Sequence, residues 1–286
     1  MGTVKLLALA GATALVSTAT FAADLSGYPP QQYLQAPVDT SGWYLRGDIG
    51  VGVQNFKSFD FTQTNAASGA VWPATWNIDQ KDIKDTTLFG IGIGYQWNNW
   101  LRIDVTGEYR NDVKFKAVGS YVNFPNPLLG RAFDLYDGDH SAVVVLANAY
   151  FDLGTWWYVT PFVGVGAGAA FHRTSALTDV GINTDGLGAS AFGFANVDRN
   201  TTAFAWAAHA GLAYNVTNNF KVEIAYRYLD MGNAHTAEVL CGSSGCGTGA
   251  GPRAFYTLTN MTSHDLKLGM RWLLQQEAPP PLMRRG

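Results

Sequence analysis

Side chains capable of ionic chemistry recur at alternate positions in several stretches of this chain. In Trp100–Arg110 ("WLRIDVTGEYR"), Arg102, Asp104, Glu108 and Arg110 alternate with apolar residues. A period of two is that of a β-strand with two unlike faces. On a soluble sheet the polar face would be solvated, whereas away from water its charges would have to pair with one another.

The same alternation places charged residues on one face of three further segments. The complete set contains seven basic and five acidic residues: Arg46, Asp48, Arg102, Asp104, Glu108, Arg110, Lys221, Glu223, Arg227, Asp265, Lys267 and Arg271. Removing such charges from bulk water is costly unless they pair. If this face lies inside the fold, we therefore predict cross-strand salt bridges with trapped waters.

Other candidate chemistry is weaker. The five histidines show no paired spacing that would indicate a metal or haem site: His140, His172, His209, His235 and His264. The chain lacks "GxSxG" and "HExxH" motifs, and the neighbours Asp139, His140 and Ser141 would point to opposite faces of a strand. The sequence therefore predicts no enzyme, metal site or cofactor, with a haem or ligand binder kept as an alternative.

Two cysteines, Cys241 and Cys246, lie in the stretch "CGSSGCGTG". The four residues between them are Gly and Ser, which can close a small loop, and export would permit oxidation. We predict a local disulfide. A metal site would need further ligands, and His235 is the candidate nearby.

The N-terminus is typical of a secretory signal peptide over residues 1–22. Lys5 precedes an apolar core, and "TFA" ends at Ala22 with small residues suited to cleavage. The alternative is an uncleaved anchor. The mature chain would begin Ala23-Asp24, with a Pro-containing periplasmic lead over 23–41 and a Pro-rich periplasmic tail over 275–286.

Composition narrows the fold class. Of 286 residues only 14% are charged, whereas 13% are aromatic and 32 are Gly. After the first twenty residues, no apolar run reaches the length of about 20 residues that a membrane-spanning helix needs. A net charge of −3 without a basic patch argues against a nucleic-acid partner. Many short strands fit this composition better than helices do.

Eight segments alternate with a period of two, and most are long for strands of soluble proteins. They are Trp43–Val53, Thr87–Trp97, Trp100–Arg110, Ser141–Asp152, Tyr158–Arg173, Thr202–Asn215, Phe220–Leu229 and Ser263–Leu274. Short and long connections alternate without exception between them. The short ones are Asn98–Asn99, Leu153–Trp157 and Val216–Asn219; the long ones are Asn55–Thr86, Lys116–His140, Thr174–Thr201 and Asp230–Thr262.

This pattern predicts an all-β fold over 42–274: an eight-stranded antiparallel up-and-down transmembrane barrel with four long outer loops and three short periplasmic turns. Its first and last strands must pair to close it. Trp and Tyr residues gather beside the short turns and the chain ends, as in an aromatic girdle at the membrane interface. We expect the protein in the outer membrane of a Gram-negative bacterium, in contact with lipid and lipopolysaccharide.

The interior of eight strands holds only modest side chains. Bulky apolar faces must therefore look outward into lipid, and the Gly-rich, charged faces must look inward. Glycines on the second, fifth and sixth strands would make room for long Arg side chains.

Three stretches carry a family resemblance: "GWYLRGDIGVG" (42–52), "AYRYLDMG" (225–232) and "HDLKLGMRW" (264–272). The chain resembles the small eight-stranded outer-membrane barrels of alphaproteobacteria, which are related in fold to opacity proteins and the OmpA transmembrane domain. The resemblance implies a surface antigen that braces the outer membrane, with some members acting as adhesins, haem binders or narrow pores.

The resemblance also implies two partners. Family strands often end the protein on an aromatic residue that the barrel-assembly machinery reads, whereas here a tail follows Trp272, so that signal would be internal. Mature barrels that begin Ala-Asp resemble substrates for covalent attachment to peptidoglycan, which makes Ala23 a candidate attachment point. An ordinary cleaved N-terminus is the alternative.

Function is open at this level. The leading hypothesis is a structural, noncatalytic surface barrel that contributes to envelope integrity and has exposed loops for interaction. The alternatives are a narrow porin or channel and a surface haem-binding, ligand-binding or adhesin protein. A charge-filled lumen of eight strands argues against conductance.

Overall fold

The computed structural model describes residues 41–63, 76–122, 131–183, 192–241 and 254–274, all within the compact unit Asp39–Gly286. No helix in this part of the chain has the length and apolarity to cross a membrane. The strands are β1 Gly42–Asn55, β2 Ser58–Gln63, β3 Trp76–Ile83, β4 Thr86–Gln96, β5 Leu101–Val122, β6 Arg131–Asp152, β7 Val159–Asn183, β8 Phe192–Phe194, β9 Arg199–Asn215, β10 Phe220–Asp230, β11 Ala234–His235, β12 Leu240–Cys241, β13 Ala254–Thr259 and β14 Thr262–Leu273.

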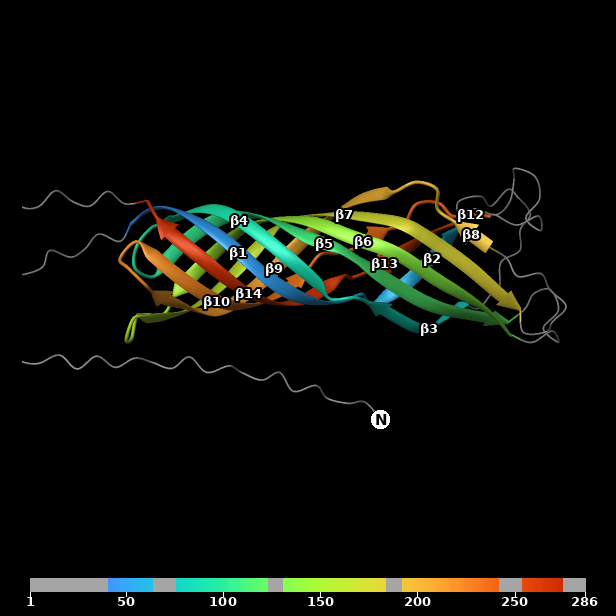
Figure 1. The fold of residues 1–286 in the computed structure, drawn as a ribbon, viewed down its shortest axis with the longest axis horizontal. Helices are drawn as coiled ribbons and strands as arrows, with labels where there is room; N and C mark the ends of the chain where they lie inside the picture. The colour runs from blue at the N-terminus through green and yellow to red at the C-terminus, as the bar shows by residue number, and fades with distance from the viewer. Residues whose placement is uncertain (1–40, 64–75, 123–130, 184–191, 242–253, 275–286) are drawn as a thin grey trace, which may run out of the picture. The chain divides into compact units, whose positions relative to one another are not determined.

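Eight of these strands form a closed antiparallel ring in the order β1, β4, β5, β6, β7, β9, β10 and β14 (Figure 1). The last strand pairs with the first along its whole length, from Leu273 opposite Tyr44 to Thr262 opposite Asn55. Closure removes the exposed strand edges that an open sheet would present. The predicted eight-stranded up-and-down barrel is confirmed.

The three short turns also match the prediction. They join β4 to β5, β6 to β7, and β9 to β10. In the first, the Asn98 side chain accepts hydrogen bonds from the backbone N–H groups of Trp100 and Leu101 at 3.0 and 2.8 Å. In the third, the Thr217 hydroxyl accepts from Phe220 N at 3.0 Å. Short polar side chains thus satisfy backbone groups that the ladder leaves free.

The expectation of long outer loops was too simple. Strands β5, β6 and β7 continue far beyond the ring as one extended sheet, and β3, β8 and β12 add to its edges. The pairing of β5 with β6 shifts between Arg110 and Val113, and that of β6 with β7 shifts between Asp137 and Asp139. A bulge changes which residues face each other and so interrupts the two-residue pattern, which is why sequence alternation ended there.

The outer end of the described fold has two layers. A small sheet of β2, β13 and β11 packs against the extensions of β5, β6 and β7 through a shared apolar core (Figure 1). Phe59 of β2 lies at its centre, with ring centroids 6.1 Å from Phe115, 5.1 Å from Tyr136 and 4.9 Å from Tyr256. We call this region the outer cap: β2, β3, β8, β11, β12 and β13, with residues 113–122, 131–140 and 174–183.

Inward glycines make room for rings. A side chain at Gly94 would collide with the Tyr44 ring, and one at Gly164 with the Tyr150 ring. Only at Gly92 does an arginine, Arg46, come close among the glycines of β4. The expectation that these glycines chiefly accommodate Arg was therefore incomplete, because buried tyrosines share the space.

Candidate functional site: the buried charge network and the outer cap

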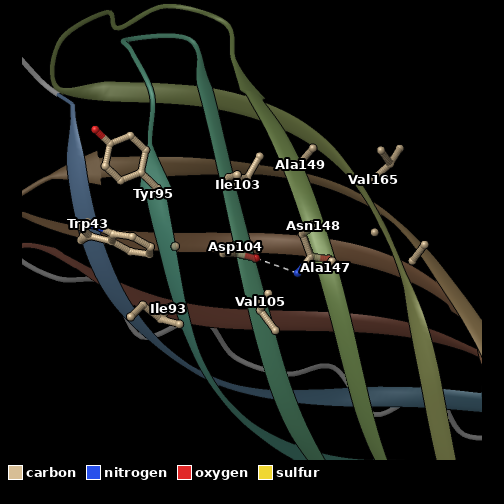
Figure 2. A pocket seen from close by; sticks show the side chains of 13 residues that line it. Trp43, Ile93, Tyr95, Ile103, Asp104, Val105, Ala147, Asn148, Ala149 and Val165 are labelled. Carbon is tan, nitrogen blue, oxygen red and sulfur yellow. Dashed lines mark hydrogen bonds between the residues drawn. The ribbon is translucent and has the colours of Figure 1, made fainter.

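The two faces of β5 lie in opposite environments. Ile103 and Val105 are 47% and 52% exposed on the outside of the barrel, whereas Arg102 and Asp104 are 0% and 4% exposed in its interior. Figure 2 shows the same stretch of wall, with Asp104 joined by a hydrogen bond to Asn148 of the neighbouring strand. The wall therefore carries its apolar side chains outward and its charges inward.

The central layer of the lumen consists of charges from opposite walls. Arg227 of β10 lies 2.5 Å from both Glu108 of β5 and Asp265 of β14. Arg110 joins the same two carboxylates at 3.0 and 2.9 Å, and Lys267 lies 3.1 Å from Glu108. Each carboxylate thus meets at least two cations, so these desolvated charges neutralise one another.

Below this layer, Arg46 connects three strands. Its guanidinium lies 2.9 Å from Asp48 and 2.9 Å from Asp104, and it donates to the Tyr150 hydroxyl at 3.0 Å. Tyr44 donates to Asp104 at 3.0 Å. These tyrosines were absent from the predicted set, although Tyr44 and Tyr150 share the inward parity of Arg46 and Asn148.

The periplasmic end of the lumen holds the remaining ion pairs. Arg102 lies 3.1 Å from Asp152, and Arg271 lies 3.0 Å from Glu223. The Arg102 guanidinium also stacks over the Tyr150 and Phe162 rings, 4.1 and 4.7 Å from their centroids. Asp152 is a further member that the predicted set omitted, although it follows Asn148 and Tyr150 on the same inward face.

Eleven of the twelve predicted network residues lie in ion pairs, and Lys221 is the exception: it makes no salt bridge with any acidic residue that the structure describes. Its side chain is half-buried at the periplasmic end of β10. The two carboxylates of this region, Asp152 and Glu223, already pair with Arg102 and Arg271.

The histidines are distributed over different regions. His140 and His172 are buried together, 3.0 Å apart, and His172 Nε2 lies 2.9 Å from the Met231 carbonyl oxygen. His209 is buried lower in the lumen, His235 lies in the outer cap, and His264 is on the outer wall beside Tyr226. Within the described ranges, no three His, Cys, Asp or Glu side chains are grouped to hold a metal ion.

The outer cap buries a chain of hydroxyl and carboxyl groups that sequence reasoning missed. The Tyr256 hydroxyl lies 3.0 Å from Asp179 and 3.2 Å from the Tyr136 hydroxyl, which in turn lies 3.4 Å from Asp134. Burial raises the pKa of Asp179 to about 7 and that of Asp134 to about 6. Its members come from β6, β7 and β13, in stretches whose composition is typical of loops. The sequence therefore did not indicate that they would meet.

Two surface features follow the outward face of the cap. A charged band contains Lys114, Lys116, Asp137 and Asp139, with Lys114 lying 3.2 Å from Asp139 and Lys116 lying 3.1 Å from Asp137. Farther from the ring, strand register aligns apolar side chains across β6, β7 and β8. We call these residues the outer patch: Phe133, Leu135, Val180, Ile182 and Phe192.

The wall of the ring carries a shallow apolar hollow of about 700 Å³ (Figure 2). Small outward side chains at Ala147, Ala149 and Ala167 form its floor, and Trp43 and Val165 stand among the larger residues around it. Around the ring, aromatic side chains near the short turns and near the ends of β1 and β14 are exposed, including Trp43, Trp97, Trp100, Trp156, Trp157, Tyr158, Tyr214 and Trp272. An exposed apolar belt with aromatic rings at one end is the surface that a bilayer requires.

The predicted disulfide and attachment point are not tested by this geometry. Cys241 is the last described residue of β12, and Cys246 lies outside the described residues. The signal peptide, Ala23 and the Pro-rich tail also lie outside them.

Comparisons with known proteins agree with this architecture. The family model named outer membrane protein beta-barrel domain matches residues 8–244. An uncharacterized protein of Brucella abortus is 32% identical over 250 residues, covering 81% of this chain and 84% of that protein. A candidate adhesin of Rickettsia prowazekii is 25% identical over 271 residues, covering 93% of this chain and 97% of that protein.

Solved structures were also compared. The outer membrane protein OprG of Pseudomonas aeruginosa gives a TM-score of 0.48 at 11% identity, covering 82% of this chain and 97% of that chain. Neisserial surface protein A gives a TM-score of 0.41 at 16% identity, covering 82% of this chain and 99% of that chain.

Proposed function

Because this chain belongs to the outer membrane protein β-barrel family of Gram-negative bacteria, we propose that it is a noncatalytic, nonconducting surface barrel that contributes to envelope integrity and uses its outer cap for adhesion. The observation that carries the proposal is the filled interior. Charges occupy the lumen within the ring, and an apolar core occupies the space beneath the cap.

The filled interior supports the absence of conductance. Arg102, Arg110 and Arg227 are fully buried by neighbours from opposite walls, and Phe59 and Phe115 are equally buried above them. An ion crossing this lumen would have to separate desolvated ion pairs and then pass through an apolar region. We therefore expect no permeation pathway at rest.

Single-channel recording in planar bilayers tests this expectation. The purified barrel should give no steady, reproducible open levels above the bare membrane. A double variant with Phe59→Ser and Phe115→Ser lacks two rings of the cap core. Its recordings show what transient ion leakage through a loosened cap would look like. Steady levels in the unmodified protein would support the narrow-pore alternative and overturn this part of the proposal.

The outer patch supports an adhesive role. Its aliphatic and aromatic side chains lie in register on an extended sheet, and Leu135, Ile182 and Phe192 are exposed. Aligned apolar residues on an exposed surface commonly mark protein-binding sites. The Rickettsia relative described as a candidate adhesin spans nearly the whole chain. These observations favour a protein partner over haem, since the two histidines that meet, His140 and His172, are buried and hydrogen-bonded, and the other three lie in different regions.

Adhesion can be tested by expressing the protein on the surface of a bacterial strain that lacks other adhesins. Leu135→Lys combined with Phe192→Lys should reduce attachment to host cells or matrix proteins at least about tenfold, as expected when interface anchors are lost. Lys116→Gln, on the same sheet but outside the outer patch, is the matched control. Equal attachment by both variants would remove the patch from the proposal.

A link to the cell wall is proposed on the sequence alone. A mature chain beginning Ala23-Asp24 would offer its N-terminal amine to peptidoglycan. A lead of this length can extend several nanometres at about 3 Å per residue. Mass spectrometry of lysozyme-digested cell walls should detect a muropeptide joined to Ala23, and its absence from complete digests would exclude the link while leaving the adhesion proposal intact.

Lipid and assembly partners complete the proposal. Acyl chains would fill the hollow over Ala147, Ala149 and Ala167, because it lies on the apolar belt. The anionic headgroups of lipopolysaccharide would meet Lys114 and Lys116 in the charged band. The barrel-assembly machinery would read a signal that ends at Trp272 within β14.

A further inference from the structure

A small cavity lies at the periplasmic end of the lumen, beside the turn between β9 and β10. Its volume is about 30 Å³, and it is lined by Gln96, Asn218, Asn219, Lys221, Arg271 and Leu273. Two cationic side chains and three amide side chains therefore surround it, and none of the residues that line it is acidic.

The charges around this cavity do not balance. Three cations, Arg102, Lys221 and Arg271, share this end of the lumen with two carboxylates, Asp152 and Glu223. Arg102 lies 3.1 Å from Asp152 and Arg271 lies 3.0 Å from Glu223, so each carboxylate has its own guanidinium. Lys221 is the surplus cation.

A second, independent observation concerns Arg271. This side chain is only 2% exposed, yet its Nη2 makes no hydrogen bond with any described residue and lies 3.9 Å from the Asp152 carboxylate. A buried guanidinium N–H without an acceptor costs about 1 to 3 kcal/mol or more. Within the part of the chain that the structure describes, the cavity thus presents a buried donor without an acceptor next to an ammonium group without a carboxylate partner.

We propose that this cavity binds one small monovalent anion, either a halide or the carboxylate of a small acid. Lys221 would supply the compensating charge, Arg271 Nη2 would donate a hydrogen bond, and side-chain amide N–H groups of Gln96, Asn218 or Asn219 would complete the shell. The size fits: one water needs about 10 to 15 Å³ of such space, so this cavity holds one ion of chloride size or two waters.

The number of charged side chains around the cavity also indicates that the anion is monovalent. One surplus cation is neutralised by a single negative charge, whereas a phosphate dianion would leave a net negative charge beside Glu223 and Asp152. The site is at the periplasmic mouth, because the turn residues Asn218 and Asn219 form part of its wall. An anion could therefore enter without crossing the buried charge network.

Bromide is the probe that tests the site directly. Crystals of the full chain grown or soaked in bromide should show an anomalous difference peak within contact distance of Lys221 Nζ and Arg271 Nη2. The peak should be lost in Lys221→Met, which removes the charge and keeps an unbranched side chain of similar length, and retained in Lys221→Arg. Only water in this cavity, or a peak that persists in Lys221→Met, would overturn the proposal.

A solution measurement gives an independent readout and separates the two anion classes. The excess chloride-35 linewidth produced by the folded barrel in detergent should fall at least threefold in Lys221→Met and remain unchanged in the control Lys114→Met. Formate should compete for the chloride signal if the site takes carboxylates, and fail to compete if it takes only halides. A linewidth equal in all variants would exclude the site.

A second variant avoids any concern about folding. Asn218 is exposed in the turn, so Asn218→Asp should leave the barrel intact while adding a carboxylate at the cavity wall. This carboxylate would pair with Lys221 and abolish bromide binding. Heat modifiability on a gel verifies folding of each variant, and undiminished bromide binding by Asn218→Asp would contradict the assigned position of the anion.

Discussion

The lumen within the ring and the core of the outer cap fill the same protein with opposite chemistry. In the lumen, Arg227, Glu108 and Asp265 reach across from three strands and pair at 2.5 Å. In the cap, Phe59 and Tyr256 stack with centroids 4.9 Å apart. Long charged side chains can span a closed ring and interlock, whereas a second sheet narrows the gap to a width that aromatic rings fill.

The two regions should therefore respond differently when a side chain is removed. Removing one partner from the lumen leaves a buried charge without compensation, whereas removing a ring from the cap leaves a cavity. The first loss should weaken the barrel as a whole, because the charges connect opposite walls. The second should weaken the cap and leave the ring intact.

Arg227→Met should have the largest effect. It removes one of the two guanidinium groups that Glu108 and Asp265 share and leaves Arg110 as the other. Breaking a buried pair costs about 3 to 5 kcal/mol. We expect the free energy of unfolding to fall by an amount near the upper end of this range. Urea unfolding in detergent micelles, followed by tryptophan fluorescence, measures it. Adding Glu108→Gln should recover part of the loss, since it removes the one negative charge that Arg227→Met leaves in excess. A loss below about 1 kcal/mol would mean that the network contributes little.

Phe59→Ala should have the next largest effect on stability, and this effect should be confined to the outer cap. Truncating a buried Phe costs about 3 to 5 kcal/mol, and partial collapse of neighbouring rings favours the lower value. Limited proteolysis should cut the cap of this variant faster, while heat modifiability of the ring stays unchanged. Phe192→Ala, an exposed ring of the same cap, is the matched control. Loss of heat modifiability would show that ring and cap unfold together.

The third prediction concerns pH and separates the cap from the lumen. Burial raises the pKa of Asp179 from 3.8 to about 7, so the folded cap holds a proton that the unfolded chain has released. Its stabilising contribution is complete below pH 3.8 and is lost as the pH rises through about 7. Between about pH 6 and about pH 8 the cap should lose on the order of 1 kcal/mol.

Hydrogen exchange of cap amides at these two pH values, corrected for intrinsic rates, measures this loss. Asp179→Asn should abolish the dependence, and the residual effect of Asp134, whose pKa burial raises to about 6, should appear at lower pH. A cap that gains protection as the pH rises would contradict the assigned direction.

The smallest effect is expected on the exposed surface. Arg173 lies 2.5 Å from Asp198, but both side chains are largely in solvent. Exposed pairs contribute about 0 to 1 kcal/mol and weaken with salt. Arg173→Met should therefore change the unfolding free energy by less than about 1 kcal/mol. A loss comparable with that of Arg227→Met would show that burial is not what distinguishes the two pairs.

The sequence by itself determined which way each side chain of the ring faces. The alternation of Arg102 and Asp104 with Ile103 and Val105 is a local property of the pleated backbone, so it can be read without knowing the neighbouring strands. Turn positions followed from Asn98 and from the run Val216–Asn219. The barrel, its closure and most of the inward charges could be predicted from these features, whereas Asp152 was omitted.

Only the tertiary structure decided which groups meet. Arg227 pairs with Glu108, 119 residues away, because the register of the closed ring brings β10 opposite β5. The pairing of β2 with β13 and the bulge after Arg110 determine where the outer cap begins. Lys221 pairs with no carboxylate among the described residues for the same reason, since the local pattern specifies a face, whereas register and reach specify a partner.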